Sequence, residues 1–301
     1  GNDSFALSQA IDLWKPQVRI PPTSLPPLRF EKLWQTDDAC GNGNDQLNQP
    51  HGVAIDPNGK LLYVADTGNR RVRQFRWDGT GGALIQNDQF QEPYDIEMNA
   101  DGSPLLLDAA AQQIFHIDPG TGNAQVVPMQ TGFYHPRGFT IDQAGNLAVA
   151  DTGGGRVVIL SSAGQVLAEF GKQGSTIAKG QPVDVLAGNG ALWAITAEDG
   201  RLWQLDTMGS LTALPRGDTL NGPHLAGLPN GSFFLSDPGR KTVLYFAPTG
   251  QPLAQFVYQD SFAVPTGIAA AQIDNFVYLA VSDTQACTLS LWQIQRNALG
   301  L

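Results

Sequence analysis

The stretch that decides the fold is Pro50-His51-Gly52-Val53-Ala54-Ile55-Asp56, followed by the turn Asn58-Gly59 and the run Leu62-Tyr63-Val64-Ala65-Asp66. Two short runs of apolar and β-branched residues around a glycine turn are typical of a β-hairpin. The same phrase begins again at Pro93, Pro136, Pro182, Pro223 and Pro265, at intervals of 43, 43, 46, 41 and 42 residues. A period in the low forties is the length of one four-stranded propeller blade. The sequence therefore predicts an all-β, six-bladed β-propeller.

The two ends of the chain predict how the ring closes. Each unit continues with a third and a fourth strand, but the sixth unit stops after its third strand, Leu289–Ile294. The segment Arg29–Trp34 has the character of the missing fourth strand. Pairing it with the last blade removes two exposed sheet edges, which open sheets must otherwise protect. We therefore expect one domain over residues 29–301, closed by an N-terminal strand, and a Pro-rich N-terminal tether over residues 1–28.

Composition narrows the classes of partner. The 301 residues include 18 Lys and Arg against 28 Asp and Glu, a formal net charge of −10. Nucleic acids and anionic membranes both select basic surfaces, so we expect neither as a partner. No apolar run approaches the roughly 18 residues of a spanning helix, so we expect no membrane insertion of this segment. A protein, a glycan or a small molecule is the expected partner, and the tether is expected to join the domain to a larger membrane-bound or exported protein.

Two cysteines, Cys40 and Cys287, are too few for a disulfide scaffold and lack the spacing of a metal site. In the predicted propeller both fall in loops of the last blade, on the same face. A bridge between them would hold the closing strand in the ring, whereas the alternative is two unpaired loop thiols. We predict the disulfide, and with it an oxidising, extracytoplasmic location.

The repeat resembles that of the NHL family of six-bladed propellers. The segment Pro50–Phe75, with Ala65-Asp66-Thr67-Gly68-Asn69-Arg70-Arg71-Val72, carries the closest copy, and Pro136–Leu160 is nearly as close. The resemblance implies a bacterial extracytoplasmic sensor or binding propeller. Other NHL relatives include RNA-binding domains, which use a basic face that this acidic chain lacks, and the peptidyl-hydroxyglycine amidating lyases. A fold alone does not name a function.

The candidate site is the top face, which carries the loops that lead into each first strand and out of each second strand. The residues expected at its central channel are His51, Tyr94, Asp95, His135, Arg137, Asp184 and His224. An aspartate ends five of the second strands: Asp66, Asp108, Asp151, Asp237 and Asp283. Three of these, Asp66, Asp151 and Asp237, precede an arginine (Arg70, Arg156 and Arg240), which favours a structural role in the turn. Asp108 and Asp283 have no such arginine and are the expected ligand-facing members.

Metal sites are alternatives. His51, His135 and His224 belong to units one, three and five, so they lie about 120° apart and could hold Zn²⁺ with an open position. Their register argues against this site, because His135 precedes its proline whereas the other two follow theirs. Calcium is a second alternative, at Asp37, Asp38, Asn42, Asn44 and Asp45, although the spacing differs from that of an EF-hand. No cofactor is otherwise expected.

Three functions follow from these observations. The first is a non-catalytic extracytoplasmic propeller that binds a ligand, a glycan or a protein on its top face. The second is a metal-dependent lyase or hydrolase that uses the channel histidines, with Arg137 as electrophile and Tyr94 as acid. The third is a structural spacer. No Gly-x-Ser-x-Gly or His-Glu-x-x-His motif is present, so no catalytic residue is assigned.

Overall fold

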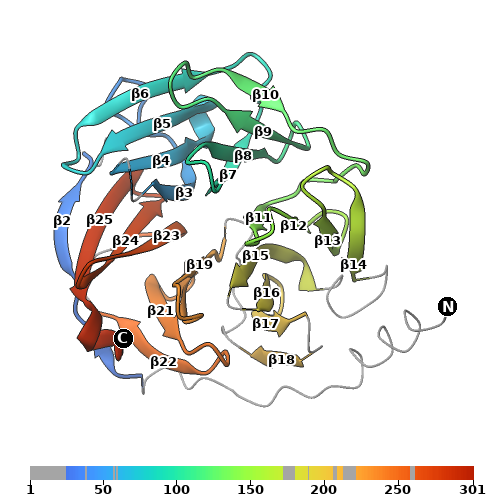
Figure 1. Ribbon diagram of the computed structural model, residues 1–301. Coiled ribbons are helices and arrows are strands. Elements are labelled where there is room, and N and C mark those ends of the chain that lie inside the picture. The colour runs from blue at the N-terminus through green and yellow to red at the C-terminus, as the bar shows by residue number, and fades with distance from the viewer. Residues whose placement is uncertain are drawn as a thin grey trace.

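The computed structural model describes residues 25–37, 39–56, 58, 60–171, 180–188, 190–205, 209–212, 222–257 and 262–301. Six antiparallel sheets are arranged around a central axis, with the first strand of each blade innermost (Figure 1). The predicted all-β, six-bladed propeller is confirmed. No helix among the described residues has the length and hydropathy to cross a membrane.

The blades follow the chain in order. Blades 1 to 3 contain β3 (Pro50–Asp56), β4 (Leu61–Asp66), β5 (Arg71–Arg76), β6 (Gly81–Gln86); β7 (Pro93–Met98), β8 (Pro104–Asp108), β9 (Gln113–Ile117), β10 (Ala124–Val126); and β11 (Gly138–Ile141), β12 (Leu147–Asp151), β13 (Arg156–Leu160), β14 (Val166–Phe170). Blades 4 and 5 contain β15 (Pro182–Gly188), β16 (Ala191–Thr196), β17 (Arg201–Gln204), β18 (Gly209–Thr212); and β19 (Leu225–Gly227), β20 (Phe233–Asp237), β21 (Thr242–Phe246), β22 (Pro252–Phe256). Blade 6 contains β23 (Pro265–Ile273), β24 (Phe276–Asp283), β25 (Thr288–Gln295) and β2 (Glu31–Gln35). The described residues also contain two short 3₁₀ turns, η1 (Thr67–Asn69) and η2 (Arg296–Leu299).

The N-terminal segment closes the ring. Strand β2 pairs antiparallel with β25, which confirms the predicted closing strand. Ahead of it, β1 (Pro27–Leu28) adds to the outer edge of blade 5 by pairing parallel with β22. Leu28 and Phe30 are buried there, and the Phe30 ring lies 5.0 Å from that of Phe256. The chain therefore contacts blade 5 before it completes blade 6; residues 1–24 of the expected tether lie outside the described residues.

A disulfide holds the closing strand to the last blade, and hydroxyl groups hold the last blade to the first. Cys40 and Cys287 are bonded, with an S–S distance of 2.09 Å, as predicted. The Thr284 hydroxyl donates to the Pro50 carbonyl at 2.7 Å, and the Ser282 hydroxyl donates to that of His51. These bonds cross directly from blade 6 to blade 1.

The inner strands approach one another closely where the repeat has glycine. A Cβ at Gly138 would lie 2.7 Å from the Asp184 Cα of blade 4, and one at Gly52 would lie 2.5 Å from the Asp95 Cα of blade 2. Real Cβ atoms do not come so close to backbone, so only glycine fits at these positions. This close approach narrows the upper part of the channel.

Candidate functional site in the axial channel

The second-strand aspartates stabilise loops. Asp66 accepts hydrogen bonds from the Asn48 amide (2.7 Å) and the Arg71 Nε (2.6 Å), so its partner is Arg71 and not the expected Arg70. Asp151 likewise bonds Arg156 (2.8 Å), and Asp237 bonds Arg240. These three carboxylates take the structural role predicted for them.

Asp108 and Asp283 also stabilise loops, although no arginine pairs with them. The expectation that they face a ligand is therefore corrected. Asp108 is fully buried and accepts the backbone N–H groups of Gln91, Glu92 and Ala111 at 2.8–3.0 Å. Asp283 accepts those of Ala263, Val264 and Ala286 at 2.6–3.0 Å. Their oxygens are therefore occupied by the loops that they close.

The three histidines do not form a zinc site. His51 and His224 are buried, whereas His135 is exposed and its ring contacts that of Tyr134 at 4.9 Å. The Tyr94 ring lies 4.3 Å from His51 and 6.3 Å from His224, so it lies between these two residues. The difference in register between His135 and the other two accounts for its position on the surface.

The calcium alternative also fails on the described residues. The Arg71 guanidinium donates to the carbonyls of Asn42 and Gly43 at 3.0 and 2.8 Å, which places a positive charge where the cation would bind. The Asp45 side chain is 83% exposed. Asp38 lies outside the described residues.

The upper end of the channel instead contains a buried ion-pair cluster of Asp95, Asp184 and His224. The His224 Nδ1 lies 3.6 Å from an Asp184 oxygen and 3.9 Å from an Asp95 oxygen. Each aspartate also fastens the next blade, since Asp95 accepts the Phe139 N–H at 3.0 Å and Asp184 accepts the Leu225 N–H at 2.6 Å. The cluster therefore joins blades 2, 3, 4 and 5 around the axis.

The His224 ring and the two carboxylates attract each other electrostatically. Burial alone lowers the pKa of His224, but the attraction of Asp184 and Asp95 more than offsets burial and leaves the pKa raised. Burial raises the pKa of Asp95. The ligand atoms of the three side chains lie within 4.8 Å of one another, as in a metal site. Because the His224 ring faces both carboxylates, we describe the cluster as an ion pair.

Tyr94, Arg137 and His51 cover this cluster. Arg137 is half-buried, donates to the Tyr94 hydroxyl at 2.7 Å and lies 4.9 Å from the Tyr94 ring. Burial raises the pKa of Tyr94 to about 12. His51 donates from Nδ1 to the Gln49 carbonyl at 3.0 Å, and its Nε2 has no hydrogen-bond partner among the described residues. Burial, together with the nearby charge of His224, lowers the pKa of His51 to about 3, so His51 is neutral. Residues 172–179, 213–221 and 258–261 lie outside the described residues.

Below the cluster, the channel opens into a pocket of about 800 Å³. All six inner strands contribute to it, and its lining reaches the turns between first and second strands of blades 3, 4 and 5. The pocket therefore opens on the face opposite the predicted one. The fourth residue after each repeat proline lines it: Ala54, Glu97, Thr140, Leu186, Gly227 and Ala269.

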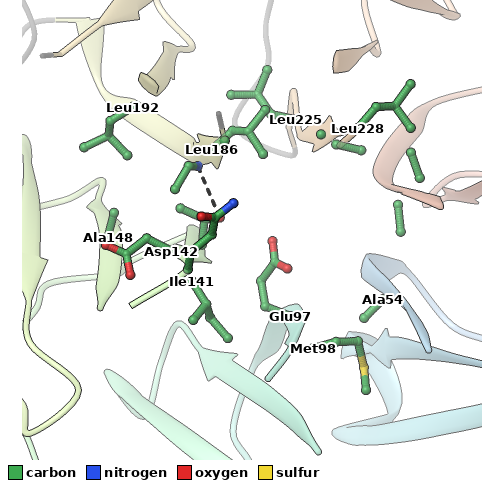
Figure 2. A pocket seen from close by; sticks show the side chains of 18 of the residues that line it. Ala54, Glu97, Met98, Ile141, Asp142, Ala148, Leu186, Leu192, Leu225 and Leu228 are labelled. Atoms are coloured by element: carbon green, nitrogen blue, oxygen red, sulfur yellow. Dashed lines mark hydrogen bonds between the residues drawn. The ribbon is translucent and has the colours of Figure 1, made fainter. Parts of the chain in front are cut away.

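Glu97 is the one charged residue of that ring, and its side chain points into the pocket, between Met98 and Ile141 (Figure 2). No described residue forms a hydrogen bond or an ion pair with its carboxyl group. The side chain is partly exposed because the pocket contains solvent, yet burial raises its pKa well above the usual range, and the charges of Asp95 and Asp184 add to this effect. A carboxyl group with a raised pKa in a concave, mainly apolar pocket is typical of a functional site.

Sequence analysis missed Glu97, although a signal for it exists. Side chains of a strand alternate between its two sides, so Glu97 lies on the same side of β7 as Asp95. The other five inner strands have a small, apolar or uncharged residue at this position. Extending the comparison of the six units by two residues would have identified Glu97.

Comparison with known proteins supports the fold and a family likeness for just under half of the chain. Residues 33–178 match the family model described as SMP-30/Gluconolactonase/LRE-like region. This match includes both of the segments on which the NHL resemblance was based, and the NHL assignment is not confirmed. No curated protein sequence matches the chain.

Several solved structures share the propeller. A streptogramin B lyase has a TM-score of 0.62 at 12% identity, covering 86% of this chain and 97% of the other. A gluconolactonase from Xanthomonas campestris has a TM-score of 0.63 at 15% identity, covering 83% and 88%. A nidogen/laminin complex has a TM-score of 0.58 at 17% identity, covering 73% and 84%. At such identities these neighbours show the fold alone. The chain is a six-bladed β-propeller whose residues 33–178 match the SMP-30/gluconolactonase/LRE-like family.

Proposed function

We propose that this chain is an extracytoplasmic small-molecule-binding propeller and that the axial pocket is its ligand site. The observation that carries the proposal is the pocket of about 800 Å³ with the unpaired Glu97 carboxyl inside it. Ligand pockets commonly have volumes of 300–1,000 Å³, with apolar walls and a few polar groups that orient the ligand. The disulfide supports the location, because such bonds persist mainly in oxidising compartments.

Methionine methyl groups provide a test. Met98 lines the pocket, whereas Met129 packs against the core between blades 2 and 3. In protein with ¹³C-labelled methionine methyls, a fragment that binds on the axis is expected to shift the Met98 signal and leave that of Met129 in place.

A variant that fills the pocket provides the control. Gly188 lines the pocket, and a Cβ built on it meets no atom within 4 Å. Gly188→Trp is therefore expected to fold and to abolish the Met98 shift. If fragments bind with equal affinity to this variant, or if none moves the Met98 signal, the axial pocket is not the ligand site.

An enzyme acting on a ligand in the same pocket is the second candidate function. The matched family model and the lyase and gluconolactonase neighbours favour it, as does the raised pKa of Glu97, which suits a general acid. Ring opening of lactones is the activity to assay. Quinupristin, which is bound in a solved structure of a virginiamycin B lyase with the same fold, is a further test substrate. If the original protein turns over a substrate and Glu97→Gln loses this turnover while fragments still bind, the chain is an enzyme. If the original protein turns over none of these substrates, the binding function remains.

A further inference from the structure

The ligand class follows from the charges of the pocket. Its described lining contains two carboxyl groups, Glu97 inside and Asp142 at the turn after β11, and no lysine, arginine or histidine. His224 and Arg137 are not part of this lining, and His224 faces Asp184 and Asp95 in the cluster above. An anionic ligand would therefore find no basic partner in the described lining.

We propose that the axial pocket binds an organic cation, an amine with an apolar body, whose ammonium group pairs with Glu97. This inference rests on the proposed function. The remaining wall is apolar, with Ile141, Leu186, Leu225 and Ile268 among its residues, and it suits an aliphatic or aromatic body. The net charge of −10 attracts cations to the molecule before they enter the pocket.

A metal ion does not fit the same wall. Calcium and magnesium take six or more oxygen ligands, whereas the Glu97 side chain lies between the apolar side chains of Met98 and Ile141 (Figure 2). An ammonium group needs only one carboxylate and a few acceptors, and a charge-assisted bond of this kind is about twice as strong as a neutral one.

Binding of the amine is linked to a proton. The free Glu97 carboxyl is neutral up to a pH well above its usual range, because burial and the charges of Asp95 and Asp184 oppose its ionisation. An ammonium group favours the carboxylate, so binding below that pH releases a proton and the affinity rises with pH. The groups that face Glu97 are Asp95 on its own strand, Asp184 on β15 and, farther up, His224 before β19; the described lining from β3 and β23 is uncharged.

Calorimetry with a matched set of ligands tests the proposal: 1-naphthylmethylamine, 1-naphthylmethanol and 1-naphthoate, which share a ring system and differ in charge. The amine is expected to bind most tightly and to release a proton, seen by comparing buffers with different ionisation enthalpies. Glu97→Gln is expected to weaken amine binding about tenfold or more and to abolish the proton release. Glu198→Gln, which removes one exposed carboxylate outside the lining, should bind the amine like the original protein.

The outcomes separate the two proposals. If the alcohol or the naphthoate binds as tightly as the amine, or if Glu97→Gln leaves amine binding unchanged, the cation proposal is wrong while the pocket remains a ligand site. If none of the three compounds binds, and the Met98 signal does not move with any fragment, both proposals fail.

Discussion

Asp95 and Glu97 lie two residues apart on the same side of β7, and they differ in their partners. Asp95 accepts two backbone N–H groups and faces His224, so its charge is compensated within the fold. Glu97 has no such partner among the described residues and faces the pocket. Unpaired buried carboxyl groups cost folding free energy, which is why they are commonly kept for a function.

This cost predicts the effect of Glu97→Gln on the stability of the ligand-free protein. The pKa of Glu97 is raised in the folded state above its ordinary value of 4.5, so the unfolded state loses its proton first as the pH rises. The free energy of unfolding should therefore be higher for Glu97→Gln than for the original protein at pH 8, and the gap should narrow toward pH 5. Urea unfolding at both pH values measures it, with Glu198→Gln as the control. An equal gap at both pH values would show that Glu97 titrates normally.

His51 makes the free energy of unfolding depend on pH in the opposite direction. Its pKa is lowered from 6.5 to about 3 on folding, so the unfolded state takes up a proton first as the pH falls. The contribution of neutral His51 is fully present above pH 6.5 and is lost at up to about 1.4 kcal/mol per pH unit below it. Unfolding titrations from pH 7 to pH 4 should show a shallower loss for His51→Gln than for the original protein. The exposed His135→Gln serves as the control, and the same slope in all three proteins would contradict the assignment.

At the scale of the element, the inner strands could be predicted from the sequence, but the contacts that they make across the ring could not. The repeated proline phrase predicted all six blades, and the leftover strand predicted the closure by β2. The parallel pairing of β1 was missed because two residues carry no periodicity. Individual members of the channel cluster were identified, but the sequence could not show that His224 lies within 4 Å of both Asp95 and Asp184, since this depends on distances across the ring.

The glycines of the inner strands give a prediction at this scale. Gly138→Ala places a Cβ 2.6 Å from the Val183 carbonyl oxygen and should destabilise the protein by about 2–3 kcal/mol or more. Gly188→Ala on the neighbouring blade meets no atom and should change stability by less than about 0.5 kcal/mol. Thermal or urea unfolding of the pair measures the difference. Equal stabilities would mean that the blades are not held as close as described.

At the scale of the whole molecule, the ring depends on a strand from the far end of the sequence. Within blade 6, the Cys40–Cys287 bond links the segment after β2 to the loop before β25, across a sequence separation of 247 residues. The bond therefore limits how far the two ends of the ring separate on opening. It also connects the fold to the proposed location, because a reducing compartment would remove this restraint.

Reduction of the disulfide should destabilise the folded ring. The loop-entropy estimate for so long a closure gives at most about 5 kcal/mol. Urea unfolding with and without dithiothreitol measures the loss, and a Cys40→Ser, Cys287→Ser double variant should match the reduced protein and ignore the reductant. Stability that is unchanged on reduction would show that β2 is held by its strand pairing alone.

The central claim is that the ligand binds on the axis, below the cluster, and not on the top face. The most direct measurement is a crystal structure of the protein grown with the tightest-binding amine from the calorimetric series. We predict the amine within the ring of Ala54, Glu97, Thr140, Leu186, Gly227 and Ala269, with its nitrogen within hydrogen-bond distance of the Glu97 carboxylate. An amine bound instead beside Arg137 and His135, with only water beside Glu97, would contradict the account.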